Sequence, residues 1–252
     1  MKISVITVCF NAQNTIGHTL RSVRDQTLDS IEHIIIDGRS NDGTLKVVES
    51  EGNHVAMIVS ERDKGIYDAM NTGISLATGD IIGFINADDF YASSDVLAAV
   101  ASAFESSGAD CCYGDLCYVQ QDDVSKIVRY WRSAPFATGM FGRGWCPPHP
   151  AFFARREVYA RLGGFDLSFK IAADFELMAR YLEAAHISSQ YIPKVLVKMR
   201  LGGTTNRSLS NIFKQNVEIR RALSKIGRQP SLISFLFNKL LIRAAQFVRR
   251  PT

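Results

Sequence analysis

The sequence predicts an α/β fold, a mostly parallel mixed sheet flanked by helices, and three observations support this prediction. Over the first 107 residues, short β-branched apolar runs alternate with segments whose apolar residues recur at helical spacing. Such alternation places parallel strands in one sheet with helices on both faces. A chain of 252 residues with 46% hydrophobic residues is long enough to bury a sizeable core. With 21% charged residues, the composition also excludes disordered, collagen-like and coiled-coil chains.

The elements of the first half follow in chain order from these patterns. Continuous apolar runs predict strands at Ile3–Phe10, Ile34–Ile36, Val55–Val59 and Ile81–Ile85. Helices are expected around Ile16, Leu20 and Val23 and over Gly65–Ala77. A third helix is expected after a cap at Ser93 or Ser94, with one apolar face made of Val96, Leu97, Val100 and Phe104. The first half is therefore a series of strand–helix units.

After about residue 108 the alternation becomes irregular. Strands are expected at Cys111–Val119 and Val124–Trp131, joined by a polar turn, and Pro147–Pro150 is expected to be a rigid loop. A helix over Ala173–Ala185 and a strand over Tyr191–Val197 follow. Five cysteines without metal-ligand spacing predict reduced thiols in a cytoplasmic protein. We expect neither a secretion signal nor a membrane span, because no apolar run reaches about 18 residues.

The net charge of +4 is unevenly distributed. Residues 200–252 carry eleven Lys or Arg against one acid, Glu218, whereas residues 1–199 are acidic. Within residues 231–252 an apolar helical face is predicted, with Lys239, Arg243 and Arg250 on an adjacent stripe. The face consists of Leu232, Ile233, Leu236, Phe237, Leu240, Leu241, Ala244, Phe247 and Val248. This basic amphipathic helix suits an anionic membrane surface, and packing on the domain or on a second subunit, in a homodimer, stays open.

Polar residues end the predicted parallel strands, where ligands bind in such sheets. They are Asn11, Asp37, Glu61–Lys64 and Asn86–Asp89. The sequence contains no dinucleotide-binding glycine fingerprint and no P-loop, which argues against a dinucleotide oxidoreductase and a P-loop NTPase. The adjacent Asp88 and Asp89 can hold a divalent cation with a diphosphate, or one of them caps the next helix.

Four of these segments, in this order, resemble the family 2 glycosyltransferases. They are Phe10-Asn11-Ala12, Asp37-Gly38-Arg39-Ser40-Asn41-Asp42-Gly43-Thr44, Asp63-Lys64-Gly65-Ile66-Tyr67-Asp68-Ala69-Met70-Asn71 and Asn86-Ala87-Asp88-Asp89. The similarity extends from Lys2 to about Gly203, and its third segment is most like the branch that assembles bacterial O-antigen, capsule and exopolysaccharide repeat units.

The resemblance implies a GT-A fold and an inverting, metal-dependent sugar transfer. The donor would be a nucleotide-diphosphate sugar, with UDP-sugars favoured and GDP- or dTDP-sugars open. The acceptor would be a hydroxyl of a lipid-linked saccharide at the inner face of the cell membrane, with no nucleic-acid partner. The implied domain covers residues 1–205, with a nucleotide-sugar-binding half over 1–107 and an acceptor-binding half over 108–205, before a helical tail over 206–252.

Residue roles follow from the same resemblance. It places Asp37 on the nucleotide base and Asn11 around the nucleoside, and it places Asp88 on the Mg²⁺ or Mn²⁺ ion and Asp89 close to the donor sugar. The third segment adds Lys64, Asp68 and Asn71 to the donor-binding residues. Lys64 is expected either to meet phosphate or to be a solvated loop lysine. The sequence departs from the family pattern at two positions. Asn86 replaces the first Asp of the family's D-x-D motif, and Gly38 follows Asp37 where a second Asp is common.

A second signature consists of Gly163-Gly164-Phe165-Asp166 and Ala172-Ala173-Asp174. It resembles the family's turn before a Glu-Asp pair, with Ala173 in place of the Glu, and it implies that Asp174 is the catalytic base rather than only a helix cap. His149 and Trp145 are candidates for acceptor binding, with structural roles as the alternatives. The rival functions are a nucleotidyltransferase, an inactive sugar-nucleotide-binding protein at the membrane, and DNA binding through the tail.

Overall fold

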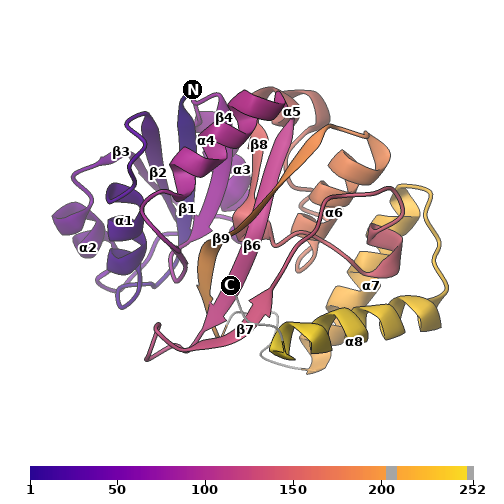
Figure 1. Ribbon diagram of the computed structural model, residues 1–252. Coiled ribbons are helices and arrows are strands. Elements are labelled where there is room, and N and C mark those ends of the chain that lie inside the picture. Colours follow the sequence, from indigo (N-terminus) through magenta and orange to yellow (C-terminus); the bar gives the residue numbers. More distant parts are fainter. Residues whose placement is uncertain (203–208, 249–252) are drawn as a thin grey trace.

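The structure is a computed structural model that describes residues 1–202 and 209–248. Among these residues, nine strands form one sheet in the order β3-β2-β1-β4-β8-β6-β9-β5, and β7 pairs with β6 off this path. Figure 1 shows helices on both sides of the sheet. The predicted α/β fold with a mostly parallel mixed sheet is confirmed.

The first half of the chain builds the parallel part of the sheet. Its strands are β1 (Ile3–Cys9), β2 (Ile31–Asp37), β3 (Val55–Ser60) and β4 (Ile81–Asn86), connected by α1 (Ile16–Arg24), α2 (Thr44–Glu51) and α3 (Ile66–Leu76). All of β1 is buried between parallel β2 and β4, as its continuous apolar run predicts. Because these four strands run in the same direction, their carboxyl ends share one edge of the sheet.

The second half adds an antiparallel strand that sequence analysis missed. β8 (Phe152–Arg155) lies between β4 and β6 (Cys111–Val119) and is antiparallel to both. Four residues that follow a proline-rich loop are too few to show a period, which explains the omission. β9 (Ser189–Arg200) runs parallel to β6, while β7 (Ile127–Trp131) and β5 (Phe90–Tyr91) complete the sheet.

The helices divide between the two faces of the sheet. Side chains of α1, α2 and α4 (Val96–Ser107) pack on one face, and those of α3, α5 (Arg156–Leu162) and α6 (Ala173–Ala179) on the other. The helix predicted over 173–185 is α6 continued by a π-helical turn, η3 (Arg180–Ala184). The cap expected at Ser93 or Ser94 is instead Asp95, whose carboxylate accepts the Ser93 hydroxyl (2.6 Å). The short helices α2 and α5 were also missed.

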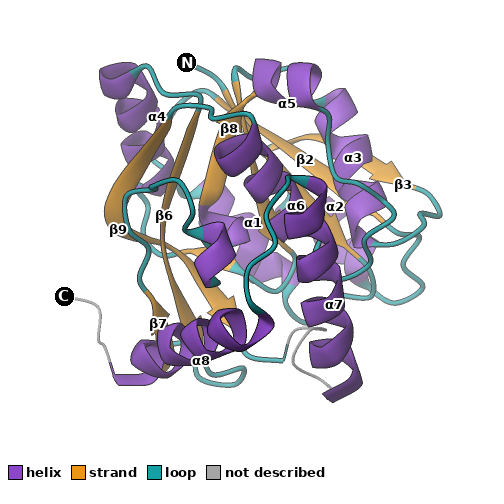
Figure 2. Cartoon of the chain, turned by 90° about the vertical axis from the view of Figure 1, so that its right-hand side faces the viewer, coloured by secondary structure: helices purple, strands orange, loops and turns teal. Residues whose placement is uncertain are grey.

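The basic tail packs on the rest of the chain. Its helices are α7 (Leu209–Lys225), which packs on α6, and α8 (Leu232–Val248), which lies along β7 and the short helix η1 (Phe141–Arg143). Figure 2 shows both helices against the body of the molecule. The expected boundary at residue 206 and the basic residue Arg250 lie outside the described residues. Within the described ranges, no helix has the length and apolar character that crossing a bilayer requires.

A buried histidine connects β1 to β2 and to the loop before β3. His33 Nε2 lies 2.8 Å from Thr7 Oγ1, and His33 Nδ1 lies 3.0 Å from His54 Nε2. Complete burial, with a smaller effect from His54, lowers the pKa of His33 to about 3. The imidazole is therefore uncharged at neutral pH.

We expect the free energy of unfolding to fall as the pH decreases from about 6.5 to 4.5. In this window the unfolded chain takes up a proton at His33 and the folded chain does not, so His33 alone favours unfolding in acid by at most about 1.4 kcal/mol per pH unit. Burial also lowers the pKa values of His18, His54 and His149, which add to the pH dependence that remains in a His33 variant. Burial raises the pKa of Glu32, but its hydrogen bonds to Lys2, Ser4 and Thr78 outweigh this effect and lower the pKa to about 2. Glu32 therefore contributes to the pH dependence of stability only below this window.

Urea unfolding at each pH tests this expectation. His33→Gln should reduce the pH dependence, and the control His186→Asn, at an exposed histidine, should keep it. An unchanged pH dependence in His33→Gln would contradict the assignment.

Candidate active site

The loops that follow β1, β2 and β3 meet at the carboxyl edge of the sheet. The backbone N–H of Asn11 donates to Ser40 Oγ (2.8 Å). A Cβ added to Gly38 would lie 2.7 Å from Asp63 Oδ2, so the loops after β2 and β3 approach each other closely at this glycine. Asn11 has a φ of +49°, which asparagine tolerates better than most residues. The three loops therefore form one polar rim.

Asp37 ends β2 and is fully buried beneath this rim. Its carboxylate accepts the N–H and the hydroxyl of Ser40 (3.0 and 2.5 Å) and the hydroxyl of Ser60 (2.6 Å). The Cys9 thiol also donates to it, and burial together with the Asp37 charge raises the pKa of that thiol. Asp37 therefore holds the ends of β1, β2 and β3 together, and its contact with the nucleotide base stays a prediction.

Asp88 and Asp89 lie in the turn after β4, and this turn is tied to β9. Asp89 is fully buried and accepts Asn86 Nδ2 (3.2 Å) and the backbone N–H of Arg200 (3.3 Å). The Arg200 guanidinium donates to the backbone oxygen of Asp88 (2.6 Å). Burial raises the pKa of Asp89, and the charge of Asp88 adds to this effect. Its carboxyl group thus supports the turn that carries Asp88, and its contact with the donor sugar stays a prediction.

Asp88 and Asn86 are the residues at this turn that fit a divalent cation. Asn86 Oδ1 is buried and has no hydrogen-bond partner within the described residues. Carboxylate and amide oxygens are ligands that Mg²⁺ and Mn²⁺ accept. The described ranges contain no group of three or more His, Cys, Asp or Glu side chains that could hold an ion. Asp88 and Asn86 alone would leave most ligand positions of an ion to phosphate oxygens and water.

Arg200, at the end of β9, is a site residue that sequence analysis missed. Its Nη2 lies 2.7 Å from His18 Nδ1, and its guanidinium lies over the Phe90 ring (5.1 Å). It also borders a pocket of about 440 Å³ beside α1 and α2. Burial, followed by the charge of Arg200, lowers the pKa of His18. In the sequence Arg200 belongs only to the basic tail, and no motif marks an arginine on β9 that contacts the loop after β4.

Asp174 lies in the first turn of α6, next to α3. The hydroxyl of Tyr67 lies 3.3 Å from Asp174 Oδ1 and 2.9 Å from the backbone oxygen of Ile171. Burial and the charge of Asp174 raise the pKa of Tyr67, which therefore remains a hydrogen-bond donor. The charge of Asp174 also adds to the effect of burial in raising the pKa of Cys146, a residue of the loop after η1.

That loop carries both acceptor candidates. The His149 ring lies near Phe84 and Phe165 (centroids 5.9 and 6.0 Å), and burial lowers its pKa while Asp174 opposes this shift. Trp145 is buried among aromatic rings, and its indole N–H has no partner within the described part of the chain. The structure places both residues on the Asp174 side, and their acceptor roles stay predictions.

Asn71, whose contact with the donor stays a prediction, holds the Gly-Gly-Phe-Asp turn. Its Nδ2 donates to the Phe165 oxygen (2.9 Å), and its Oδ1 accepts the Phe165 N–H (2.8 Å). A Cβ on Gly164 would lie 2.3 Å from Asn71 Oδ1, which explains the glycine. Asp68 accepts the backbone N–H of Lys64 (2.9 Å) at the start of α3, and Lys64 is exposed. The donor roles of Asp68 and Lys64 stay predictions.

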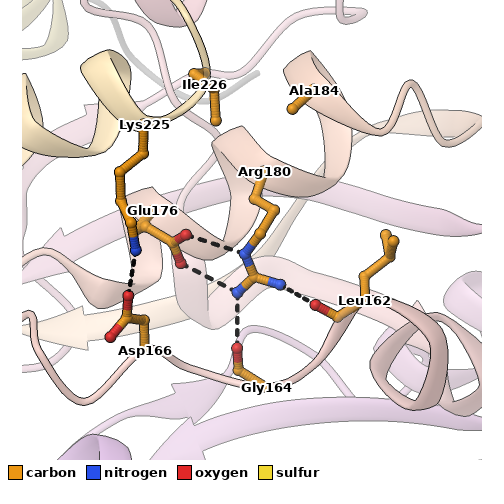
Figure 3. Close-up of a pocket in the computed structure, with 8 residues that line it drawn as sticks. All are labelled: Leu162, Gly164, Asp166, Glu176, Arg180, Ala184, Lys225 and Ile226. Carbon is orange, nitrogen blue, oxygen red and sulfur yellow. Dashed lines mark hydrogen bonds and ion pairs between the residues drawn. The ribbon is translucent and has the colours of Figure 1, made fainter.

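A pocket of about 470 Å³ lies behind the same turn. Figure 3 shows its two ion pairs, Glu176 with Arg180 and Asp166 with Lys225. Arg180 also donates to the Gly164 oxygen (2.7 Å). Because these charges neutralise one another, we interpret the pocket as structural support for the turn. Glu176 is buried in its ion pair, which leaves Asp174 as the acid of α6 that lies beside Tyr67.

The site thus contains two acidic groups from different halves of the chain. Asp88 ends the parallel half, and Asp174 begins a helix of the other half. Burial raises the pKa of Tyr118, Arg129 and Arg243 oppose this shift, and the charges of Asp89 and Asp174 add to it. A parallel half joined to a mixed extension, with acidic residues at the ends of strands and helices, is the arrangement of the GT-A glycosyltransferase fold.

The chain belongs to glycosyl transferase family 2, whose family model matches residues 4–163. Glycosyltransferase Rv1514c of Mycobacterium tuberculosis is 36% identical over 180 residues, which cover 71% of this chain and 68% of the relative. A PGL/p-HBAD biosynthesis glycosyltransferase of the same species is 28% identical and covers 92% of both chains. The Escherichia coli enzyme UDP-Glc:alpha-D-GlcNAc-diphosphoundecaprenol beta-1,3-glucosyltransferase WfgD is 33% identical over 90 residues, 35% of this chain and 36% of that enzyme.

Solved structures confirm the GT-A fold. TarS (residues 1–349) of S. aureus in complex with UDP-GlcNAc superposes with a TM-score of 0.70 and 17% identity, covering 97% of this chain and 74% of that chain. The mannosyltransferase PcManGT of Pyrobaculum calidifontis, in complex with GDP-Man and Mn²⁺, has a TM-score of 0.62 and 19% identity, with coverage of 99% and 81%.

Proposed function

We propose that this glycosyltransferase inverts the anomeric centre of a sugar that it moves from a nucleotide-diphosphate donor to a hydroxyl of a lipid-linked saccharide. The observation that carries the proposal is the position of Asp174, a carboxylate beside Tyr67 at the junction of the two halves. The name of the relative WfgD supports a lipid-diphosphate acceptor and polysaccharide synthesis. UDP-sugars are favoured because WfgD and TarS use or bind them, and PcManGT keeps GDP-sugars open.

Asp174 acts as the general base in this mechanism. It accepts the proton of the acceptor hydroxyl, whose oxygen attacks the anomeric carbon on the side opposite the diphosphate. Tyr67 orients the carboxylate through its hydroxyl. Single displacement forms one glycosidic bond, breaks one sugar–phosphate bond and releases the nucleoside diphosphate. In this proposal, His149 and Trp145 line the acceptor side. The donor side is lined by Asn11, Asp37, Lys64, Asp68, Asn71 and Asp89.

A divalent cation fits the turn after β4, where Asp88 and Asn86 would hold it. When bound, it supplies positive charge that stabilises the diphosphate leaving group. Asp89 and Arg200 hold this turn in place: Asp89 accepts the backbone N–H of Arg200, and the Arg200 guanidinium donates to the backbone oxygen of Asp88.

Asp174→Asn should reduce turnover by about 10²- to 10⁴-fold, the usual contribution of general-base catalysis, while donor affinity changes little. Asparagine retains an oxygen for Tyr67 but accepts no proton. The rate is measured as nucleoside diphosphate release with water as acceptor, from the donor that best raises the melting temperature in a panel of UDP-, GDP- and dTDP-sugars.

Exposed Asp122→Asn is the matched control and should have the wild-type rate. Near-normal turnover of Asp174→Asn would contradict its role as base. Donor binding without turnover in the wild-type chain would instead favour an inactive sugar-nucleotide-binding protein.

Binding of UDP should depend on Mn²⁺ or Mg²⁺ through Asp88. Loss of an outer-shell partner costs about 10- to 100-fold in metal affinity, so loss of a direct ligand in Asp88→Ala should cost at least as much. Isothermal titration of UDP with Mn²⁺ and with excess chelator measures this effect, and Asp122→Ala is the control. Equal UDP affinity of the wild-type chain under both conditions would contradict a metal role.

The structure also supports a proposal for the tail. The side of α8 that faces the protein carries Phe235, Lys239 and Gln246, of which Lys239 Nζ donates to Asn216 Oδ1 of α7 (2.7 Å). The opposite side is exposed and apolar: Leu236, Phe237, Leu240, Leu241 and Phe247 are 41–65% exposed. We propose that this outer face enters the anionic inner surface of the cell membrane, with basic residues of the tail near lipid head groups.

Leu240→Glu combined with Leu241→Glu should reduce binding to vesicles that contain phosphatidylglycerol by more than tenfold, since burying each leucine contributes about 1.5–3 kcal/mol. Truncation is a weaker test because it removes Phe235 from the core. The control is Met57→Glu with Ile58→Glu, two exposed apolar residues of β3.

Cosedimentation with vesicles measures the binding. Unchanged cosedimentation would contradict the membrane proposal. A concentration-dependent dimer in the wild-type chain that the α8 variant abolishes, without vesicle binding, would assign the face to a second subunit.

A further inference from the structure

Glu218, the single acid of residues 200–252, binds the segment that leads into α6. Its carboxylate accepts three successive backbone N–H groups: Lys170 donates to Oε1 (2.9 Å), and Ile171 and Ala172 donate to Oε2 (2.8 and 2.9 Å). Hydrogen bonds to an ionised acceptor are stronger than neutral ones. Glu218 belongs to α7, beyond the residues that the family model matches.

The peptide unit between Ile171 and Ala172 is held from both sides. Its N–H donates to Glu218, and its oxygen accepts the hydroxyl of Tyr67 (2.9 Å). The same hydroxyl lies 3.3 Å from Asp174 Oδ1. Two residues separate this peptide from Asp174, so the positions of α3, α7 and the carboxylate are coupled through a few hydrogen bonds.

Two further side chains on the same side of α7 bind the segment upstream. Arg221 donates to Ser168 Oγ and lies over the Phe169 ring (4.4 Å), and Lys225 pairs with Asp166 (2.5 Å). Residues 218, 221 and 225 are spaced so that they share one helix face. The helix thus supports the whole segment 166–172, with Glu218 at the end closest to Asp174.

We propose that Glu218 is a positioning residue that orients Asp174 for proton transfer, an inference that rests on the proposed role of Asp174 as base. Without this acceptor, three amides lose their common partner and the entry to α6 is free to shift. Misplacement of a catalytic group by about 1 Å can cost about 10²-fold in rate. Glu218 therefore affects turnover without touching the donor.

Glu218→Gln is the test variant. It keeps the side-chain volume but leaves one acceptor oxygen and directs an NH₂ group toward backbone donors. We expect the rate of nucleoside diphosphate release, per donor-binding site counted by calorimetry, to fall by about 10- to 100-fold. KM and donor affinity should stay within about twofold, and Glu218→Asp should recover part of the rate. The control Arg220→Gln replaces an exposed residue of α7 and should keep the wild-type rate.

A double variant separates this inference from the proposed function. If Glu218 acts through Asp174, then Glu218→Gln should lower the rate of Asp174→Asn by less than about threefold. Two results would overturn the positioning role and leave Asp174 as base. One is a double variant in which Glu218→Gln lowers the rate as much as it does in the wild-type chain. The other is a normal rate in Glu218→Gln while Asp174→Asn is impaired. Normal turnover of Asp174→Asn would instead contradict the proposed function.

Discussion

The site depends on one constraint: the irregular segment between Gly163 and Ala172 crosses a partly buried region, and its backbone polar groups need partners there. Neighbouring helices supply them. Asn71 of α3 pairs with both backbone groups of Phe165, Arg180 binds the Gly164 oxygen, and Glu218 of α7 accepts three successive N–H groups. The position of Asp174, directly after this segment, follows from these bonds.

This constraint changes the role of the tail. Its charge suggests an appendage, but α7 contributes to the support of Asp174, and α8 buries Phe235 in the same core as α3 and α6. The apolar outer face of α8 lies on the other side of that helix. One helix pair thus supports the proposed base and presents an apolar surface, as the proposed lipid-linked acceptor requires.

Much of the fold was predictable because continuous apolar runs such as Ile3–Cys9 and Ile81–Asn86 are typical of the fully buried strands of a parallel sheet. β8 was not, because its pairing with β4 and β6 depends on contacts between distant segments. Motif positions located Asp88 and Asp174 correctly at strand and helix ends. The same motifs did not show which polar side chains have partners in the fold, so the structure was needed to find the hydrogen bonds of Asp37, Asn71 and Asp89. Arg200 and Glu218 carry no local signal, since their partners are more than 40 residues away in sequence.

The central claim is that Asp174 serves as a base in a single displacement, not as a nucleophile in a double one. Time-resolved proton NMR of the sugar released from a nucleotide sugar, recorded before mutarotation, tests it directly. The account predicts that the first sugar formed has the anomeric configuration opposite to that of the donor. A first product with the donor's own configuration would contradict it.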